Sequence, residues 1–212
     1  MEYKKILAKH LLSYLKSGLI IGIGSGSTME IFVDEIQSFL KNNPMDLSFV
    51  SSSNIISEKL KGLNVLDLTE VKKIDLTIDG LDYVNLDTGL VLKGNGGALY
   101  LEKKLALKSE KVVLATDYRK LDFNYCNKLM LEYKTEFIDE LSSFKIKARE
   151  NLSDSGNLIV EVPLKSEGDI FAWRDALNKT KGFIDDGDFS GLVDEVCIIY
   201  ENGGIKKFNI LE

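Results

Sequence analysis

Apolar residues in the first half of the chain form short runs that alternate with segments of helical periodicity. The short runs, rich in branched side chains, lie at residues 19–23, 47–50, 65–68, 74–78 and 112–115. Helical spacing of apolar residues is found before residue 18 and at residues 28–40, 55–61 and 98–108. Short apolar runs are typical of strands that are covered on both faces of a sheet. Strands and helices in this alternation predict an α/β fold with a doubly wound, mostly parallel sheet.

The order of elements changes after about residue 125. Strands are predicted at residues 129–133, 145–150, 158–164 and 182–185, with helices at residues 135–144 and 167–179. The order β-α-β-β-α-β is that of a ferredoxin-like unit. The run at residues 196–200 and the tail that follows it are expected to return to the first sheet. We therefore predict a Rossmann-like domain, residues 1–125 plus 190–212, and a smaller inserted ferredoxin-like α+β domain, residues 126–189.

Composition narrows the class of protein. The chain has 212 residues, 44% of them apolar, and a formal net charge of −6. Without a basic block, neither nucleic acid nor an anionic membrane is expected as a partner, and the apolar runs are too short to span a bilayer. Cys126 and Cys197 lack the spacing of a metal site and no signal peptide precedes them, so we expect two ordinary thiols in a cytoplasmic protein.

A glycine-rich turn follows the first predicted strand, at residues 22–28 (Gly-Ile-Gly-Ser-Gly-Ser-Thr). It departs from a dinucleotide-binding fingerprint, because a serine replaces the third glycine and the next strand ends in serines instead of a ribose-binding acid. Nor is it a P-loop, since no lysine follows the glycines. One interpretation is a strand-to-helix turn in which Ser27 and Glu30 form a capping box. We favour an anion-binding cradle made of the backbone and hydroxyl groups of Ser25, Gly26, Ser27 and Thr28.

Two aspartates follow the predicted strand at residues 74–78. Asp79 and Asp82 would lie where the loops of open α/β sheets form a binding crevice. Each also has a purely structural interpretation, because Asp79 before Gly80 is a common turn sequence and Asp82 could be a solvated surface acid. Magnesium binding is a third interpretation, but no other acid stands at a suitable spacing, so we expect no metal.

A second glycine turn, at residues 93–97 (Lys-Gly-Asn-Gly-Gly), precedes the predicted helix at residues 98–108. It would place unpaired backbone N–H groups at the helix N-terminus, where they attract anions. Glu102 lies on that helix among leucines, and a carboxylate partly removed from water binds a proton more readily, which suits a general base. Lys120 follows a later strand and could face the same crevice. For Glu102 and for Lys93, the alternative is an ordinary solvated side chain.

The combination of these motifs resembles ribose-5-phosphate isomerase type A. The matching segments are residues 22–28, 51–53, 79–82, 93–99 and 102–103, in the family's order and at similar separations. Each motif alone is weak evidence, whereas the set is specific, and the resemblance extends over essentially the whole chain. It implies an enzyme of the non-oxidative pentose phosphate pathway that interconverts ribose 5-phosphate and ribulose 5-phosphate, without a metal or an organic cofactor. It also implies a homo-oligomer, a dimer or a tetramer, whose partner is a small pentose phosphate.

The resemblance also implies roles for individual residues. Glu102 would be the base that moves a proton between adjacent carbons of the open-chain sugar. Asp79, Asp82 and Lys93 would open the furanose ring and handle the hydroxyl protons. The implied substrate-binding surface consists of Ser25, Gly26, Ser27, Thr28, Gly80, Leu81, Gly94, Asn95, Gly96 and Lys120. The residue types suit an enediol route, which needs a carboxylate base and donors for the oxyanion that develops beside it.

Some positions depart from the family's usual sequence. Leu81 and Tyr83 stand where alanine and glutamate are usual, Asn95 where glycine is usual, and Leu101 where arginine is usual. The lost charges at Tyr83 and Leu101 would be one compensated change if those two side chains normally pair. Two other hypotheses remain open at this point: a sugar-phosphate sensor that lacks the chemistry, and a coenzyme A transferase-like protein with a glutamate nucleophile.

Overall fold

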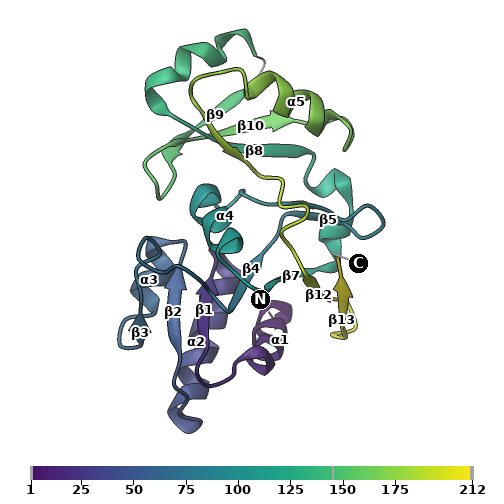
Figure 1. Ribbon diagram of the computed structural model, residues 1–212. Helices are drawn as coiled ribbons and strands as arrows, with labels where there is room; N and C mark the ends of the chain where they lie inside the picture. Colours follow the sequence, from purple (N-terminus) through teal and green to yellow (C-terminus); the bar gives the residue numbers. More distant parts are fainter. Residues whose placement is uncertain (1, 145, 211–212) are drawn as a thin grey trace.

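The largest sheet is the predicted doubly wound one. The computed structural model describes residues 2–144 and 146–210, and within them seven strands form this sheet in the order β13-β12-β7-β4-β1-β2-β3 (Figure 1). Neighbouring strands are parallel except β12 and β13, which are antiparallel. The strand bounds are Ile20–Ile23 (β1), Ser48–Ser51 (β2), Asn64–Val65 (β3), Leu76–Gly80 (β4), Val112–Asp117 (β7), Glu195–Ile199 (β12) and Ile205–Asn209 (β13). The prediction that the end of the chain returns to this sheet is confirmed.

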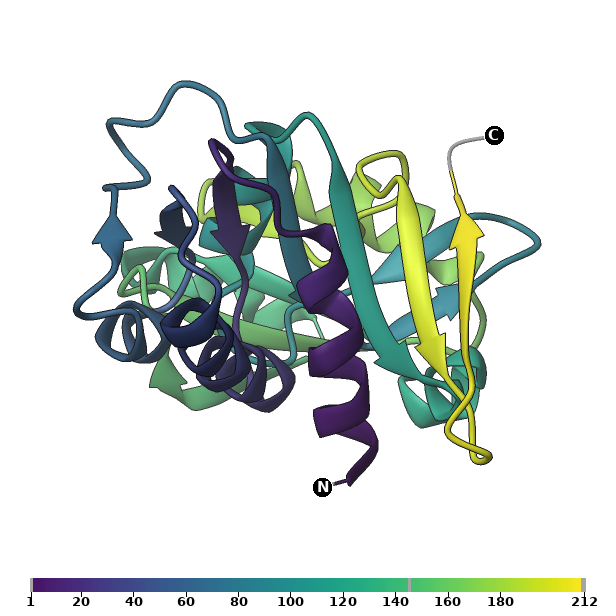
Figure 2. The same cartoon turned by 90° about the horizontal axis from the view of Figure 1, so that it is seen from below.

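Helices cover both faces of this sheet, as the view from below makes clear (Figure 2). One face carries α1 (Glu2–Leu11), a 3-10 turn η1 (Leu12–Tyr14), α2 (Ser27–Asn42) and α3 (Asn54–Lys59). The other face carries α4 (Leu99–Leu107) and a hairpin of β5 (Tyr83–Asn85) and β6 (Leu90–Leu92). Along β7, Val113 and Ala115 pack on the first face, whereas Val112 and Leu114 pack on the second. Burial on both faces explains why the predicted strands are unbroken apolar runs.

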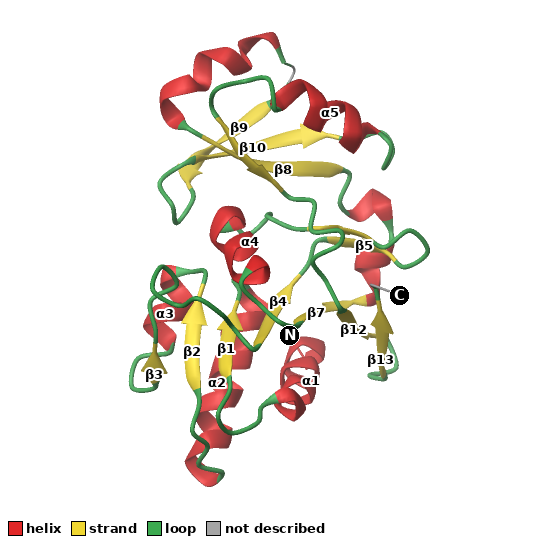
Figure 3. Ribbon diagram, in the orientation of Figure 1, coloured by secondary structure: helices red, strands yellow, loops and turns green. Residues whose placement is uncertain are grey.

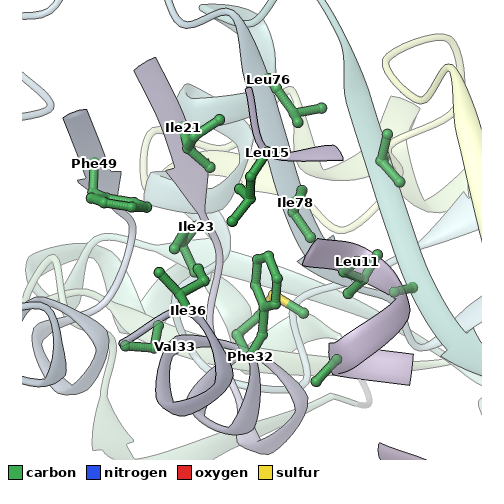
Figure 4. Close-up of a cluster of buried hydrophobic side chains, with 14 of the residues drawn as sticks. Leu11, Leu15, Ile21, Ile23, Phe32, Val33, Ile36, Phe49, Leu76 and Ile78 are labelled. Carbon is green, nitrogen blue, oxygen red and sulfur yellow. The ribbon is translucent and has the colours of Figure 1, made fainter. Parts of the chain in front are cut away.

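The core between the sheet and α2 consists of apolar side chains at helical spacing on α2 and at alternate positions on β1 (Figure 4). Phe32, Val33 and Ile36 recur at helical spacing on α2, and all three are fully buried. They pack in one cluster with Ile21 and Ile23, which lie two residues apart on β1 and so point to the same face of the sheet. This packing fixes the position of β1, and with it the start of the glycine-rich turn.

A second sheet lies beyond α4 (Figures 1 and 3). Its strands are antiparallel, in the order β11-β8-β10-β9. Its elements are β8 (Lys128–Tyr133), η4 (Thr135–Ser143), β9 (Lys147–Leu152), β10 (Leu158–Pro163), α5 (Asp169–Leu177) and β11 (Phe183–Asp186). Two short 3-10 turns, η2 (Tyr118–Leu121) and η3 (Phe123–Tyr125), connect β7 to β8. The chain thus follows the predicted β-α-β-β-α-β order, and the predicted fold class is confirmed.

Several element boundaries differ from the sequence-based expectations. β4 ends at Gly80 and not at residue 78, because pairing with β7, where Asp79 aligns with Leu114, extends the strand. Asp79 therefore lies within the strand, and only Asp82 follows it. β3 has two residues, where the apolar run at 65–68 predicts four. The helix predicted at residues 135–144 is a 3-10 segment with a break at Phe137, and Lys145, the predicted start of the next strand, lies outside the described residues.

The predicted capping box before α2 is wrong. Gly26 occupies the N-cap position with φ of 86°, Ser27 is the first helical residue, and no side chain caps this helix. The physical reason is the backbone conformation at Gly26, in the left-handed region that glycine adopts without steric cost. The Ser27 hydroxyl instead accepts a hydrogen bond from Lys4 Nζ at 2.5 Å.

Gly187 joins the segment before α4 to the second sheet through main-chain hydrogen bonds. Its carbonyl accepts from the Lys93 N–H at 2.8 Å, and its own N–H donates to the Met130 carbonyl of β8 at 2.7 Å. A Cβ atom at Gly187 would lie 2.3 Å from the Lys93 carbonyl oxygen. The close approach of three backbone segments thus requires glycine at this position.

We predict that Gly187→Ala destabilises the protein. The added methyl group must push apart the segments that carry Lys93 and Met130, which should cost about 2 kcal/mol or more of unfolding free energy. Chemical denaturation measures this loss. Gly168→Ala is the matched control, because a Cβ at Gly168 would lie at an ordinary contact distance of 3.6 Å from Ser166 Oγ. Equal stability of the two variants would contradict the prediction.

Candidate active site

A cavity of about 270 Å³ opens at the carboxyl ends of β1 and β4. These strands are neighbours at the point where the strand order reverses, since the chain leaves β1 toward β2 on one side and later continues on the other side with β4. Open α/β sheets bind ligands at such switch points. The predicted residues that line the cavity are Ser25, Gly26, Ser27, Thr28, Asp79, Gly80, Leu81, Asp82, Lys93, Gly94, Gly96, Glu102 and Lys120. Asn95 is exposed and does not line it.

Three buried charged side chains meet in the wall of this cavity. Lys93 Nζ lies 2.8 Å from Asp79 Oδ2 and 3.3 Å from Glu102 Oε2. The three residues are between 2% and 4% exposed. Lys93 Nζ also donates a hydrogen bond to the Gly80 carbonyl at 2.6 Å. The strand β4, the turn before α4 and the helix itself each contribute one charge to this group.

Both carboxylates are held in fixed orientations. Glu102 Oε1 accepts a hydrogen bond from Ser25 Oγ at 2.5 Å, so its two oxygens face different partners. Asp79 Oδ1 accepts from the N–H groups of Gly80 at 2.6 Å and Ser25 at 3.2 Å. Ser25 thereby contacts both acids, through its backbone and through its hydroxyl.

A glycine on the neighbouring strand segment makes room for Asp79. A Cβ atom at Gly24 would lie 1.7 Å from the Asp79 carboxyl carbon. Gly22, two residues earlier, is under the same constraint, since its Cβ would lie 2.1 Å from Thr77 Oγ1. Two of the glycines that resemble a nucleotide fingerprint are therefore required because the side chains of β4 approach β1 closely.

The electrostatic environment moves two pKa values in this group. Burial raises the pKa of Asp79 to about 7, and the Glu102 carboxylate adds to this effect while the Lys93 ammonium opposes it. Burial acts to lower the pKa of Lys93, but the attraction of Asp79 and Glu102 outweighs it and raises the pKa overall. Lys93 therefore stays cationic at neutral pH, whereas Asp79 exchanges its proton near neutrality.

Asp82 belongs to a separate part of the cavity wall. Its Oδ2 accepts a hydrogen bond from the Asn95 N–H at 2.9 Å, and its Oδ1 lies 3.8 Å from Lys120 Nζ. Lys120 Nζ in turn lies 4.5 Å from the centre of the Tyr125 ring. The structure thus brings both predicted aspartates to one cavity, with different partners.

Lys4 lines the cavity although the sequence pattern does not predict it as a site residue. Lys4 comes from α1 and contacts Ser27 at the first turn of α2. No motif surrounds it, since a lysine on the polar side of an N-terminal helix has the pattern of any solvated residue. Tyr3, Thr116, Asp117, Arg119 and Tyr125 also line the cavity without having been predicted. Of these, Arg119 is bound in two-point contact by Asp117, through its Nε and Nη2 groups.

Comparison with known proteins decides the family. The sequence model of ribose 5-phosphate isomerase A, also called phosphoriboisomerase A, matches residues 48–203. The protein named ribose-5-phosphate isomerase A from Streptococcus agalactiae is 32% identical over 218 aligned positions, which cover 95% of this chain and 96% of that protein. This chain belongs to the ribose 5-phosphate isomerase A family. The resemblance drawn from the motifs is therefore confirmed.

Other members of the ribose 5-phosphate isomerase A family agree with this result. The Lactobacillus helveticus protein of that name is 32% identical, over 96% of this chain and 94% of its own. The solved structure of ribose 5-phosphate isomerase from Plasmodium falciparum superposes with a TM-score of 0.86 at 27% identity, covering 98% of both chains. A structure of D-ribose-5-phosphate isomerase in complex with phospho-erythronic acid superposes with a TM-score of 0.84 at 28% identity, covering 98% of each chain.

The positions that depart from the family's usual residues lie apart from one another. Tyr83 packs in the cluster of the second sheet and its hydroxyl donates to Glu167. Leu101 packs on α4 against a different cluster, which contains Val50 and Leu105. The two changes are thus accommodated separately, which speaks against the hypothesis of one compensated pair.

The described residues were compared with the requirements of a metal site and of a membrane-spanning helix. In the part of the chain that the structure describes, no group of three or more His, Cys, Asp or Glu side chains is arranged to hold a metal ion. None of the described helices combines the length and apolar character needed to cross a membrane. Cys126 and Cys197 are both buried free thiols, as expected from the sequence.

The raised pKa of Asp79 predicts a pH-dependent contribution to stability. An aspartate in the unfolded chain ionises near pH 4, whereas the pKa of Asp79 in the native protein is about 7. Between these values the native state binds a proton that the unfolded state has released. This contribution is complete below about pH 4 and is lost as the pH rises through about 7. Lys93, with its raised pKa, is protonated in both states throughout this range.

We therefore expect Asp79→Asn to gain unfolding free energy relative to the unsubstituted protein as the pH rises from about 4 to about 7. Urea denaturation at a series of pH values measures the difference between the two proteins. Asp87→Asn, a change at an exposed position in the β5–β6 loop, is the control and should show a difference that is independent of pH. A pH-independent difference for Asp79→Asn as well would contradict the prediction.

Proposed function

We infer that this protein is an aldose–ketose isomerase that interconverts ribose 5-phosphate and ribulose 5-phosphate. The observation that carries the inference is the buried group of Asp79, Lys93 and Glu102 at the cavity of a chain that belongs to this family. The reaction moves one proton between C1 and C2 of the open-chain sugar and one between the oxygens attached to them. It requires no electron acceptor, and we propose that it proceeds without a metal or an organic cofactor.

Glu102 is the proposed base. Its carboxylate takes the proton from C2 of ribose 5-phosphate, which leaves an enediolate, and returns that proton to C1 to give ribulose 5-phosphate. Ser25 Oγ holds one carboxylate oxygen at 2.5 Å and Lys93 Nζ faces the other at 3.3 Å. This two-sided restraint supports transfer between adjacent carbons, because the carboxylate needs only a small displacement between them.

Lys93 is the proposed donor to the developing oxyanion. Its pKa is raised, so it remains an ammonium group throughout the neutral range. In the turn before α4, the N–H groups of Asn95 and Gly97 already donate to Asp82 Oδ2 and to the Gly94 carbonyl, so those of Gly94 and Gly96 are the proposed further donors to the same oxygen. A fixed positive charge in a buried position stabilises a developing negative charge more strongly than it would in water.

Asp79 and Asp82 are the proposed groups for ring opening and for proton exchange at the hydroxyls. The furanose form of the sugar must lose the proton of its anomeric hydroxyl and gain one on the ring oxygen. A carboxyl whose pKa is about 7, such as that of Asp79, can donate and accept protons at neutral pH. Asp82 lines the same cavity, next to Lys120.

The phosphate is proposed to bind where α1 meets the first turn of α2. Lys4 Nζ contacts Ser27 there, and the free N–H groups of the α2 N-terminus add donors that favour anions. Ser25, Gly26 and Thr28 line the same part of the cavity, and Gly80, Leu81, Gly94, Gly96 and Lys120 complete the proposed substrate surface. Binding at this remote group orients the reacting carbons at Glu102.

The wider setting of the enzyme is also a proposal. We place it in the cytoplasm, where free thiols such as Cys126 and Cys197 persist, as an enzyme of the non-oxidative pentose phosphate pathway. We propose a dimer or tetramer, supported by the exposed apolar side chains Ile138 and Phe171 on the second sheet's helices. Residues 126–189 are the proposed inserted domain, because every strand of the second sheet lies between Lys128 and Asp186.

We expect Glu102→Gln to lower kcat for ribose 5-phosphate by about 10³-fold, because an amide cannot accept the proton from carbon. The formation of ribulose 5-phosphate measures turnover, and calorimetric titration with a phosphorylated sugar acid measures binding, which should remain. Glu110→Gln is the control, since Glu110 is an exposed residue that pairs with Lys73.

The outcomes separate the competing functions. No interconversion by the unsubstituted protein, or full activity of Glu102→Gln, would overturn the assignment. Tight binding of the sugar phosphate without turnover would favour the sensor. A covalent glutamyl adduct formed with an acyl-coenzyme A would favour the transferase.

We expect Lys4→Met to raise KM for ribose 5-phosphate by about tenfold with little change in kcat, because the phosphate is bound equally in the ground and transition states. Lys5→Met is the matched control, since Lys5 is 62% exposed in its side chain and pairs with Glu35 at 3.8 Å. Steady-state kinetics of both variants test this expectation. An unchanged KM for Lys4→Met would place the phosphate elsewhere.

A further inference from the structure

An arginine of the second sheet contacts the glycine turn beside the proposed active site. Arg149 lies on β9, one of the two edge strands of that sheet. Its Nη1 donates a hydrogen bond to the Asn95 carbonyl oxygen at 2.7 Å, and its Nη2 donates to Asn95 Oδ1 at 2.5 Å. One planar guanidinium therefore binds both oxygens of a single residue, a two-point contact that fixes orientation as well as distance.

The guanidinium is itself held by the second sheet. Arg149 Nε donates to Glu161 Oε1 on β10 at 2.9 Å. Lys128 Nζ on β8 lies 3.1 Å from the other oxygen of that carboxylate. All three guanidinium nitrogens of Arg149 are thus used, and the group is oriented by two neighbouring strands.

Asn95 connects Arg149 to Asp82, a residue that lines the cavity. Its N–H donates to Asp82 Oδ2 at 2.9 Å, and Asp82 Oδ1 faces Lys120 Nζ. Asn95 does not itself line the cavity, but it stands between Gly94 and Gly96, which do. A continuous series of polar contacts therefore runs from Glu161 through Arg149 and Asn95 to Asp82.

The composition of the turn explains why it needs such a restraint. Gly94 and Gly97 adopt φ values of 105° and 86°, and Gly96 lies between them, so three of four successive residues lack a side chain. Glycine gives a segment the greatest backbone freedom and the largest loss of entropy on ordering. Asn95 is the one side chain in this stretch that another element can hold, and only a residue with a side-chain acceptor satisfies both Nη groups.

We propose that Arg149 is a positioning residue for the isomerisation: acting through Asn95, it orders the turn at residues 94–97 and fixes the Asp82 carboxylate. The proposal rests on the proposed function for its effect on turnover. The ordering of residues 94–97 by Arg149 does not depend on the proposed function, because it concerns only the mobility of that backbone segment. Arg149 does not line the cavity, so we expect its effect on catalysis to be exerted through Asn95.

The test compares Arg149→Met, Arg149→Lys and Asn95→Gly, together with the double variant Arg149→Met/Asn95→Gly. Arg149→Met should lower kcat/KM for ribose 5-phosphate by about tenfold, since small displacements of aligned groups have effects of this size. Arg149→Lys should recover part of the loss, because one ammonium can reach only one of the two oxygens. Glu150→Met is the matched control on the same strand, at an exposed position, and should leave kcat/KM unchanged.

Hydrogen exchange measured by mass spectrometry gives a readout that general destabilisation would not produce. Arg149→Met should increase exchange in peptides that cover residues 93–98 while exchange in β1, β7 and β12 stays as in the unsubstituted protein. The loss of kcat/KM on Arg149→Met should also be smaller in the Asn95→Gly background, where half of the contact is already absent.

Two results would overturn the proposal. One is unchanged exchange at residues 93–98 in Arg149→Met. The other is an equal loss of kcat/KM on Arg149→Met with and without Asn95→Gly, which would mean that Arg149 acts independently of Asn95. If the unsubstituted protein failed to isomerise ribose 5-phosphate, the proposed function would fall, while the exchange measurement would still decide whether Arg149 orders the turn.

Discussion

The rest of the structure depends on the burial of one lysine between two carboxylates. Removing Asp79, Lys93 and Glu102 from water is costly, because each charge loses its hydration. Their mutual attraction offsets this cost, and Ser25 and the Gly80 backbone satisfy Glu102 Oε1, Asp79 Oδ1 and one N–H of Lys93. Among the described residues, Glu102 Oε2 has no hydrogen-bond partner and faces only the Lys93 ammonium, at 3.3 Å. The group also carries one more negative than positive charge when both acids are ionised, and the raised pKa of Asp79 relieves this excess by retaining a proton up to about pH 7. Burial and this excess of negative charge together give Asp79 the pKa that its proposed role in ring opening requires.

Holding that group together restricts the backbone around it. Gly24 must lack a side chain because Asp79 occupies the space of its Cβ, and Gly187 must lack one because it joins Lys93 to the second sheet. Core packing of α2 on β1 places Ser25 within reach of Glu102. The second sheet therefore helps to hold the site in place. It contacts Lys93 through Gly187, and it contacts Asn95 through Arg149.

The sequence predicts the layers and the acidic group well, because both depend on local signals. Apolar runs mark the strands. Asp79 directly follows such a run and precedes a glycine, and Glu102 lies on a helix among leucines, where a charged residue is uncommon. The capping box at Ser27 fails because the pattern cannot distinguish a capping serine from a first helical residue that follows a glycine of positive φ. Lys4 and Arg149 are missed for a different reason. Each reaches the site from a distant part of the chain, and nothing in its own neighbourhood marks it.

The distribution of burial explains how an acidic protein can bind an anionic sugar next to two acids. The chain carries a formal net charge of −6, so long-range attraction does not bring the substrate in. The carboxylates of Asp79 and Glu102 are almost fully buried, and each lies within 3.3 Å of the Lys93 ammonium. Lys4 and Lys120 are less buried and line the same cavity, where a phosphate can remain partly hydrated. In the proposed site, Lys93 neutralises the two acids, while Lys4 and Lys120 face the phosphate, so that separate cations serve the two ends of one small substrate in a single cavity.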